Sequence, residues 1–193
     1  MTSVCVFCGS SAGAKAAYAQ AAADAGDTIA RRGLGLVYGG GHVGLMGIAA
    51  DAALRAGGKV IGVITHALEV REVGHTGLTT LHIVQTMHER KAMMASLSDA
   101  FLVLPGGIGT LEEFFEVWTW GQLGEHAKPC GLVNVGGYFD GLIGFLDHAV
   151  AEQFLKPKHR QMLIVGETPA EVLDRFAGYV PPAVGKWIAK PDW

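Results

Sequence analysis

Short apolar runs recur along the chain, and most of them end in glycine or in polar loop residues. Several are rich in β-branched residues, which is typical of strands that are buried on both faces of a sheet. The sequence therefore predicts seven strands. They cover Val4–Cys8, Leu34–Tyr38, Val60–Ile64, Leu81–Val84, Ala100–Leu104, Cys130–Val133 and Met162–Val165.

Between most of these runs, apolar residues recur with helical spacing. The predicted helices cover Lys15–Arg32, Leu45–Ala56, Met87–Leu97, Leu111–Trp120, Phe139–Gln153 and Pro169–Phe176. Because strand and helix alternate through nearly the whole chain, we expect an α/β fold with a parallel sheet flanked by helices on both faces. The segment from Thr65 to Thr80 shows no clear period, and we expect a loop or a short irregular excursion there.

Length and composition suit one domain with a substantial core. The chain has 193 residues, of which 50% are hydrophobic, and its mean hydropathy is +0.30. We expect this domain to span residues 1–180. Residues 181–193 contain three prolines and two tryptophans, which predicts an extended C-terminal tail that packs on the domain or on a second subunit.

The charge balance argues against polymeric nucleic acid as a partner. A net charge of −3 and a pI near 6.2 provide no basic field for a DNA or RNA backbone, whereas a small anion needs only local charge. The first residues lack a basic leader, and no apolar stretch is long enough to span a bilayer. We therefore expect a cytoplasmic protein that has no membrane partner.

Cysteines and histidines show no pattern of a disulfide framework or a metal site. The three cysteines are an odd number, and Cys5 and Cys8 lie three apart on a predicted strand, where they point to opposite faces. The histidines form no helical pair at metal-ligand spacing and have no matching carboxylates, so we interpret most as surface or loop residues. They are His42, His66, His75, His82, His88, His126, His148 and His159.

Three loops follow the predicted strands at the edge where parallel strands converge on one crevice. They are Gly9–Ser11, Gly39–Gly44 and Pro105–Thr110. The second matches G-x-G-x-x-G but lacks the acidic residue about twenty positions later that a dinucleotide site needs. Its glycines either admit a mononucleotide or simply allow tight turns and close helix packing.

The loop at Pro105–Thr110 leads from a buried strand into an amphipathic helix. Glycines bring N–H groups close to a ligand and the helix start carries partial positive charge, which together form a cradle for an anion such as phosphate. Glu113 would repel a phosphate beside it, so it either caps the helix in a Thr110–Glu113 capping box or faces another part of the ligand. The apolar stripe of this helix comprises Leu111, Phe114, Phe115 and Trp118, which leaves Glu113 free to reach a cleft.

Arg90 interrupts the apolar face of the predicted helix Met87–Leu97. A guanidinium at such a position is costly unless it is paired or binds an anion. A structural salt bridge or a side chain that reaches up to water would also explain it. Because the loop that begins at Pro105 follows the next predicted strand, we favour a site that Arg90 shares with Glu113.

Two segments resemble motifs of a known family. Thr86–Ala92 and Pro105–Glu113 are similar to the paired M-x-x-R-K and P-G-G-x-G-T-x-x-E motifs of the LONELY GUY (LOG) family. Its members are phosphoribohydrolases that act on cytokinin riboside 5′-monophosphates. The resemblance extends from Cys8–Ser11 through Tyr38–Gly41 to Thr119–Gly124, and we see no departure within either motif.

The resemblance implies a Rossmann-like homodimer that cleaves the N-glycosidic bond of a nucleoside 5′-monophosphate to free base and ribose 5-phosphate. AMP is a further candidate substrate, and no metal or cofactor is required. The family's catalytic roles fall on Arg90 and Glu113. The resemblance and the glycine loops together predict substrate contacts at Ser10, Gly40, Gly41, Glu72, Lys91, Gly106, Gly107, Ile108, Gly109, Thr110, Leu111, Glu112 and Thr119.

The chemistry agrees with these residue types, because a carboxylate stabilises an oxocarbenium-like state and orients or deprotonates the attacking water. The main alternative is a non-catalytic nucleotide-binding or carrier protein of the same fold. A pyridoxal phosphate-dependent decarboxylase would need a Schiff-base lysine, and Lys91 is the only candidate in these motifs. Independently of the resemblance, the aromatic residues of the helix Leu111–Trp120 offer more apolar surface than one sheet face normally covers, which favours a dimer.

Overall fold

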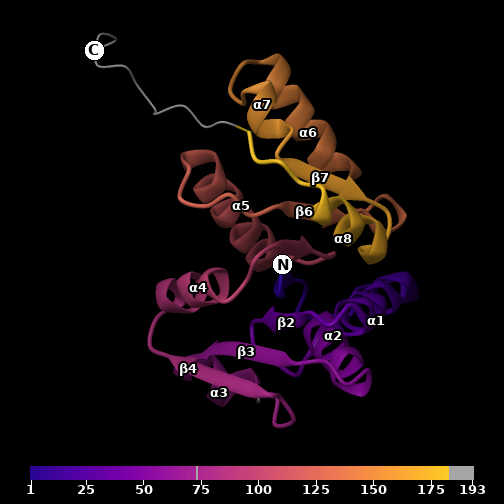
Figure 1. The fold of residues 1–193 in the computed structure, drawn as a ribbon, viewed down its shortest axis with the longest axis vertical. Coiled ribbons are helices and arrows are strands. Elements are labelled where there is room, and N and C mark those ends of the chain that lie inside the picture. Colours follow the sequence, from indigo (N-terminus) through magenta and orange to yellow (C-terminus); the bar gives the residue numbers. More distant parts are fainter. Residues whose placement is uncertain (73, 183–193) are drawn as a thin grey trace.

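A computed structural model describes residues 1–72 and 74–182, and the side chains of residues 71 and 72 are not among those described. Its seven strands form one parallel sheet in the order β4-β3-β2-β1-β5-β6-β7 (Figure 1). The strands are β1 Ser3–Phe7, β2 Gly35–Tyr38, β3 Val60–Thr65, β4 Thr80–Val84, β5 Phe101–Val103, β6 Cys130–Val133 and β7 Leu163–Gly166. The predicted parallel sheet is confirmed, and the bounds of the strands differ by a residue at most from those predicted.

The helices also follow the prediction, with two short helices and one 3₁₀ turn in addition. They are α1 Ala16–Arg31, α2 Gly44–Arg55, α3 His66–Glu72, α4 Met87–Ser96, α5 Ile108–Leu123, the 3₁₀ turn η1 Val135–Gly137, α6 Asp140–Ala151, α7 Pro157–Arg160 and α8 Pro169–Ala177. The expectation of an irregular segment from Thr65 to Thr80 is wrong at α3, and α7 was not predicted. Both helices are too short for an apolar period to be visible in the sequence.

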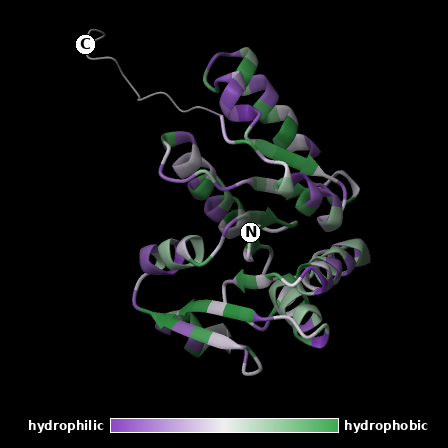
Figure 2. Ribbon diagram, viewed as in Figure 1, coloured by the Kyte–Doolittle hydropathy of each residue, from purple (hydrophilic) through white to green (hydrophobic). Residues whose placement is uncertain are grey.

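Helices cover both faces of the sheet and form two cores. One core joins the sheet to α1, α2 and α8, and the other joins it to α4, α5 and α6. In Figure 2 the hydrophobic colour predominates on most strands, while the helices carry both hydrophobic and hydrophilic residues. Cys8 belongs to the first core and Cys5 to the second, so the expected opposite orientation of these cysteines is confirmed, and both are free and buried.

The strand order reverses between β1 and β5, which are neighbours in the sheet although far apart in sequence. Ligands of open α/β sheets bind in the crevice beyond the carboxyl ends of the strands at such a reversal. Backbone hydrogen bonds join the two loops there, because Gly9 N donates to Pro105 O at 3.1 Å and Leu104 N donates to Phe7 O at 2.9 Å. The fold thus brings the first and third predicted glycine loops together.

The predicted tail, residues 181–193, lies outside the described part of the chain from residue 183 onward, so its packing stays a prediction. Among the helices within residues 1–72 and 74–182, none is both long enough and apolar enough to cross a membrane.

Candidate active site

A cavity of about 280 Å³ lies at the carboxyl ends of β1 and β5. Loops from both strands and side chains from four helices form its wall. The lining residues are Cys8, Gly9, Ser10, Met46, Leu68, Arg90, Gly107, Ile108, Gly109, Thr110 and Glu113. Arg90 and Glu113, which the sequence analysis placed in one site, do line one cavity.

The first turn of α5 faces this cavity with little side chain to obstruct it. Gly107 is the N-cap residue, and no acidic residue lies in the first turn. A Cβ added to Gly107 or Gly109 would meet nothing within 4 Å, so packing does not require glycine at either position. Since the first N–H groups of a helix lack partners within it, this open helix start suits an anionic ligand.

Of the two alternatives for Glu113, the structure excludes the capping box with Thr110. Because α5 begins at Ile108, Thr110 lies inside the helix and Glu113 lies in its second turn. Gly107 serves as N-cap without a side-chain hydrogen bond, and glycine is well tolerated at that position. Glu113 therefore has no role in starting the helix, and its carboxyl group is directed to the cavity.

A capping box does exist at the start of α4, the helix that carries Arg90. The Thr86 side chain accepts a hydrogen bond from Glu89 N at 3.1 Å, and the Glu89 carboxylate accepts one from Thr86 N at 3.2 Å. This arrangement satisfies two backbone donors at once and holds the first turn of α4 in place.

The Arg90 guanidinium is buried and is fixed by the backbone of β3 and of the loop after β2. Only 6% of the residue is exposed, Nε donates to Val63 O and Nη2 donates to Gly39 O, each at 3.0 Å. Nη1 lies 3.8 Å from Glu113 Oε1. A Cβ on Gly39 would lie 2.0 Å from Arg90 Nη2, so glycine at this position makes room for the guanidinium.

The Glu113 carboxyl group titrates near neutrality. Its side chain is 13% exposed, and burial is the main cause that raises its pKa from 4.5 to about 7. The positive charge of Arg90 works against this rise, while the neighbouring Glu112 adds to it. Glu113 is thus populated in both protonation states at neutral pH, which suits a group that accepts and returns a proton.

Lys91 is paired away from this cavity. Its ammonium group contacts the Glu112 carboxylate and lies 3.0 Å from Glu116 Oε2, and the residue is 8% exposed. Burial lowers the pKa of Lys91, but the hydrogen bonds to Glu112 and Glu116 outweigh that effect and raise its pKa above the ordinary value. Lys91 is therefore held as a cation, the form that does not attack a carbonyl.

The cavity brings together some of the predicted contacts and leaves others outside. Those that line it are Ser10, Arg90, Gly107, Ile108, Gly109, Thr110 and Glu113. Those that do not line it are Gly40, Gly41, Lys91, Gly106, Leu111, Glu112 and Thr119. The side chain of Glu72 lies outside the described residues.

Three of the predicted glycines that do not line this cavity have a role in backbone packing instead. Gly40 has a φ of +76°, and a Cβ there would press on Ile64 and Leu81 at 3.2 Å. Gly41 forms an isolated bridge with Gly74. A Cβ on Gly106 would lie 2.1 Å from Thr110 Oγ1. Gly40 and Gly41 thus allow a turn and a close approach, which is the second of the two interpretations of the G-x-G-x-x-G loop. Gly106 allows a close approach within the loop after β5, and it lines a second, neighbouring cavity.

Three lining residues, Cys8, Met46 and Leu68, were not predicted, and Gly9 was predicted only as part of a loop at the crevice. The carboxyl-end rule that placed Gly9 at the crevice could also have found Cys8, because Cys8 directly follows β1. Leu68 lies on α3, which was not predicted. Burial raises the pKa of the Cys8 thiol well above its usual range, and Glu113 adds to the rise, so Cys8 is an inert part of the wall.

A second cavity, also about 280 Å³, continues the first on the side of α1 and shares Gly9, Ser10 and Gly107 with it. Tyr18 and Tyr138 line it with edge-to-face rings whose centroids are 5.5 Å apart. The Tyr138 hydroxyl donates to Gly106 O at 2.7 Å. The two cavities together offer room for a ligand larger than a sugar phosphate.

These features define a class: a Rossmann-like α/β protein whose cavity combines an open helix start with a buried carboxyl and arginine pair. The family model described as "Possible lysine decarboxylase" matches residues 46–176. The cytokinin riboside 5′-monophosphate phosphoribohydrolase LOG1 of Arabidopsis thaliana is 48% identical over 190 residues, which are 98% of this chain and 89% of that protein. The probable cytokinin riboside 5′-monophosphate phosphoribohydrolase LOGL5 of Oryza sativa subsp. japonica is also 48% identical, over 98% of this chain and 77% of that protein. The chain belongs to the LOG family.

Solved structures with other titles share the fold. The molybdenum cofactor carrier protein of Chlamydomonas reinhardtii has a TM-score of 0.71 at 20% identity, over 92% of this chain and 99% of that chain. The molybdenum cofactor binding protein of Rippkaea orientalis has a TM-score of 0.69 at 20% identity, over 92% and 96%. At this identity the likeness shows the fold alone.

Proposed function

We propose that the chain is a phosphoribohydrolase that hydrolyses the N-glycosidic bond of cytokinin riboside 5′-monophosphates, with AMP as a further substrate. Its products are the free base and ribose 5-phosphate. The observation that carries the proposal is the buried Glu113 carboxyl, which has a pKa of about 7 and lies 3.8 Å from Arg90 in a cavity that opens on the start of α5.

The 5′-phosphate binds at the start of α5, against the backbone N–H groups of Ile108, Gly109 and Thr110. Phosphate is favoured there because the helix start carries partial positive charge and its first amides lack partners. This binding energy, remote from the reacting bond, holds the ribose in position for reaction. A nucleoside without the phosphate is therefore a poor substrate.

Glu113 acts in its ionised form at the ribose. It stabilises the positive charge that develops on the sugar as the bond to the base breaks, and it accepts a proton from the water that adds to the anomeric carbon. The base leaves with the bonding electron pair and takes up a proton. Arg90, anchored on Val63 O and Gly39 O, keeps part of Glu113 ionised despite its burial.

Two alternatives are less well supported. Relatives that are 48% identical over nearly the whole chain are named as phosphoribohydrolases, which favours turnover over a carrier role. The lysine decarboxylase named by the family model would need a neutral lysine at the cofactor, whereas Lys91 is paired with two glutamates and does not line the cavity.

The proposal includes a homodimer in the cytoplasm. The aromatic residues of α5 give a dimer less support than expected, because Phe114 and Trp118 are buried within the chain itself. The support is instead the family resemblance, which also predicts a ligand contact at Thr119, an exposed α5 residue that does not line the cavity of its own chain. Static light scattering tests this, and a monomer at micromolar concentration would contradict it. The three buried, free cysteines suit a reducing compartment.

The test of the function compares isopentenyladenosine 5′-monophosphate, AMP and their two nucleosides. We expect ribose 5-phosphate and free base in equal amounts from the nucleotides, and turnover of the nucleosides that is lower by at least about a hundredfold. Equal turnover of AMP and adenosine would contradict the proposed role of the 5′-phosphate in binding. Binding of the nucleotides without formation of any product would favour the interpretation as a nucleotide carrier.

A further inference from the structure

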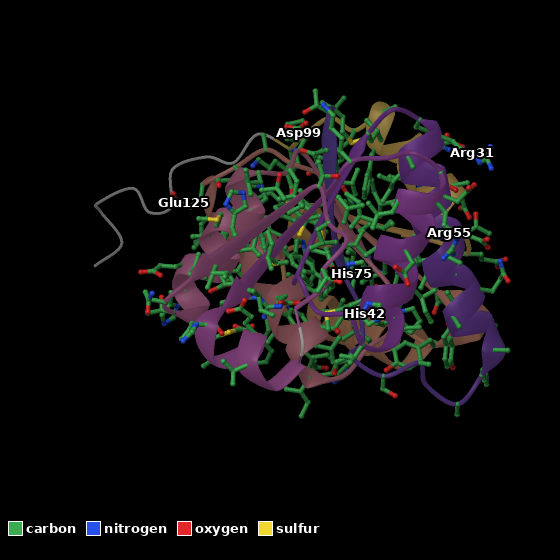
Figure 3. All side chains as sticks on the ribbon, turned by 90° about the horizontal axis from the view of Figure 1, so that it is seen from below. Arg31, His42, Arg55, His75, Asp99 and Glu125 are labelled. Atoms are coloured by element: carbon green, nitrogen blue, oxygen red, sulfur yellow. The ribbon has the colours of Figure 1, made fainter. Side chains whose placement is uncertain are left out.

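Three side chains that are distant in sequence meet outside the cavity. His42 follows β2, Asp51 lies on α2 and His75 lies after α3. Each offers one ligand atom, and these atoms all lie within 4.8 Å of one another. Figure 3 labels His42 and His75, which lie close together beside α2. We propose that these residues form a Zn²⁺ site that braces the segment after α3.

The cluster is centred on a buried ring. His75 is 7% exposed, and its Nε2 lies 2.9 Å from Asp51 Oδ1. The His42 ring stands edge-on to the His75 ring, with centroids 4.7 Å apart and an interplanar angle of 73°. Within the described part of the chain, no hydrogen bond engages the ring nitrogens of His42. One imidazole is thus held in place, and a second is available beside it.

The backbone that carries these residues is held together by independent contacts. His75 N donates to Gly40 O at 3.1 Å, and Gly41 forms a bridge with Gly74. A Cβ on Gly47 would lie 2.1 Å from His42 O, so α2 packs directly on the backbone of His42. Tetrahedral zinc separates its ligand atoms by about 3.3 Å. The ligand atoms lie within 4.8 Å of one another, and the exposed His42 and half-exposed Asp51 side chains are free to rotate toward that spacing.

The donor set selects the metal. Two imidazoles and one carboxylate suit zinc with a water as the fourth ligand, and they suit Mg²⁺ or Ca²⁺ poorly because those ions prefer oxygen. Gly77 N now donates to His75 Nδ1 at 3.1 Å, so the ring proton lies on Nε2. When metal binds Nε2, this proton moves to Nδ1 and the exposed Gly77 amide turns to water.

The site would act on structure rather than on the reaction. None of the three residues lines the cavity. His75 and Gly74 come shortly after α3, whose Leu68 forms part of the cavity wall. A metal that joins His75 to α2 and to the loop after β2 would hold this end of the α3 segment against the sheet. Bound metal should therefore raise the melting temperature of the folded protein.

The experiment is a cobalt titration of the full chain, purified without a polyhistidine tag and stripped of metal. Wild type should take up one equivalent of Co²⁺, develop the intense visible bands of a tetrahedral site and lose them when Zn²⁺ is added. His42→Ala changes an exposed side chain and should weaken binding by at least about tenfold. The exposed His148→Ala on α6 should bind like wild type.

His75→Gln provides a second check, because glutamine keeps a donor for Asp51 and so preserves the contact that orders the segment. It should fold as judged by circular dichroism and should bind no cobalt with tetrahedral spectra. If wild type shows no such spectrum, or if His42→Ala titrates like wild type, the proposal is overturned and the cluster is only a hydrogen-bonded pair with a neighbouring ring. The readout is spectral, so it is independent of whether the chain hydrolyses nucleotides.

Discussion

Glu113→Gln should make the protein more stable at neutral and alkaline pH while it removes activity. Glutamine is nearly isosteric with glutamate but carries no charge, so it avoids the cost of burying a carboxylate that is 13% exposed. The same charge is needed for oxocarbenium stabilisation, so turnover should fall by about 10² to 10⁴-fold. Activity and stability make opposite demands on this one side chain.

The magnitude follows from the pKa. Burial raises the pKa of Glu113 from 4.5 to about 7, a rise of roughly 2.5 units, and each unit is worth about 1.36 kcal/mol. Below pH 4.5 the group is protonated in both the folded and the unfolded chain, so it costs no stability. As pH rises from 4.5 to 7 the unfolded chain releases the proton while the folded chain keeps it, and wild type loses up to about 3 kcal/mol. Above pH 7 the loss is complete.

The assay is urea unfolding of wild type and Glu113→Gln across this pH range. The difference in free energy of unfolding should increase in favour of the variant by about 3 kcal/mol between about pH 4 and pH 8. Glu152→Gln makes the same chemical change at an exposed position and should follow wild type at every pH. Parallel pH profiles for Glu113→Gln and wild type would refute the burial argument, and a folded variant with wild-type turnover would refute the catalytic role.

Three further predictions concern the same site. The value of kcat/KM should rise with pH through an apparent pKa of about 7, because Glu113 acts as the carboxylate; a rate that falls across this range would assign it the role of an acid. Arg90→Ala should abolish turnover and destabilise the chain by about 3 to 5 kcal/mol in urea, because it leaves Glu113 without its cation and two backbone carbonyls without their donor. Gly39→Ala should displace the Arg90 guanidinium and reduce kcat. Gly109→Ala adds a methyl group in open space at the helix start, so it should keep the fold and raise KM for the nucleotide. Equal effects of the two substitutions on kcat would contradict the packing argument.

The sequence by itself determined the scaffold and predicted the candidate site. Seven apolar runs and the helical periods between them are local patterns, and in a parallel sheet such patterns leave little freedom in where each element lies. The glycine loop after β5 and an arginine on an otherwise apolar helix face were also visible without coordinates. Because loops at the carboxyl ends of parallel strands converge, these two features predicted a shared site.

Local pattern was less reliable where two short-range arrangements compete. Thr110 and Glu113 have the spacing of a capping box, but α5 begins earlier at Ile108, and a capping box starts α4 at Thr86 instead. A glycine can take the N-cap position with no side-chain signal, so the sequence alone could not choose between the two starts. That choice decided whether Glu113 was a structural or a catalytic candidate.

Only the tertiary structure decided the properties that depend on burial and on contacts across the sheet. The pKa of Glu113 is near 7 because the folded chain removes its carboxyl from water, and no neighbour in sequence causes that. The requirement for glycine at position 39 comes from Arg90, which lies on another helix. His42, Asp51 and His75 lack any metal-binding spacing along the chain and meet only because α2 and the segment after α3 pack on the same loop. Such properties depend on distances in space, which the order of residues specifies only through the fold.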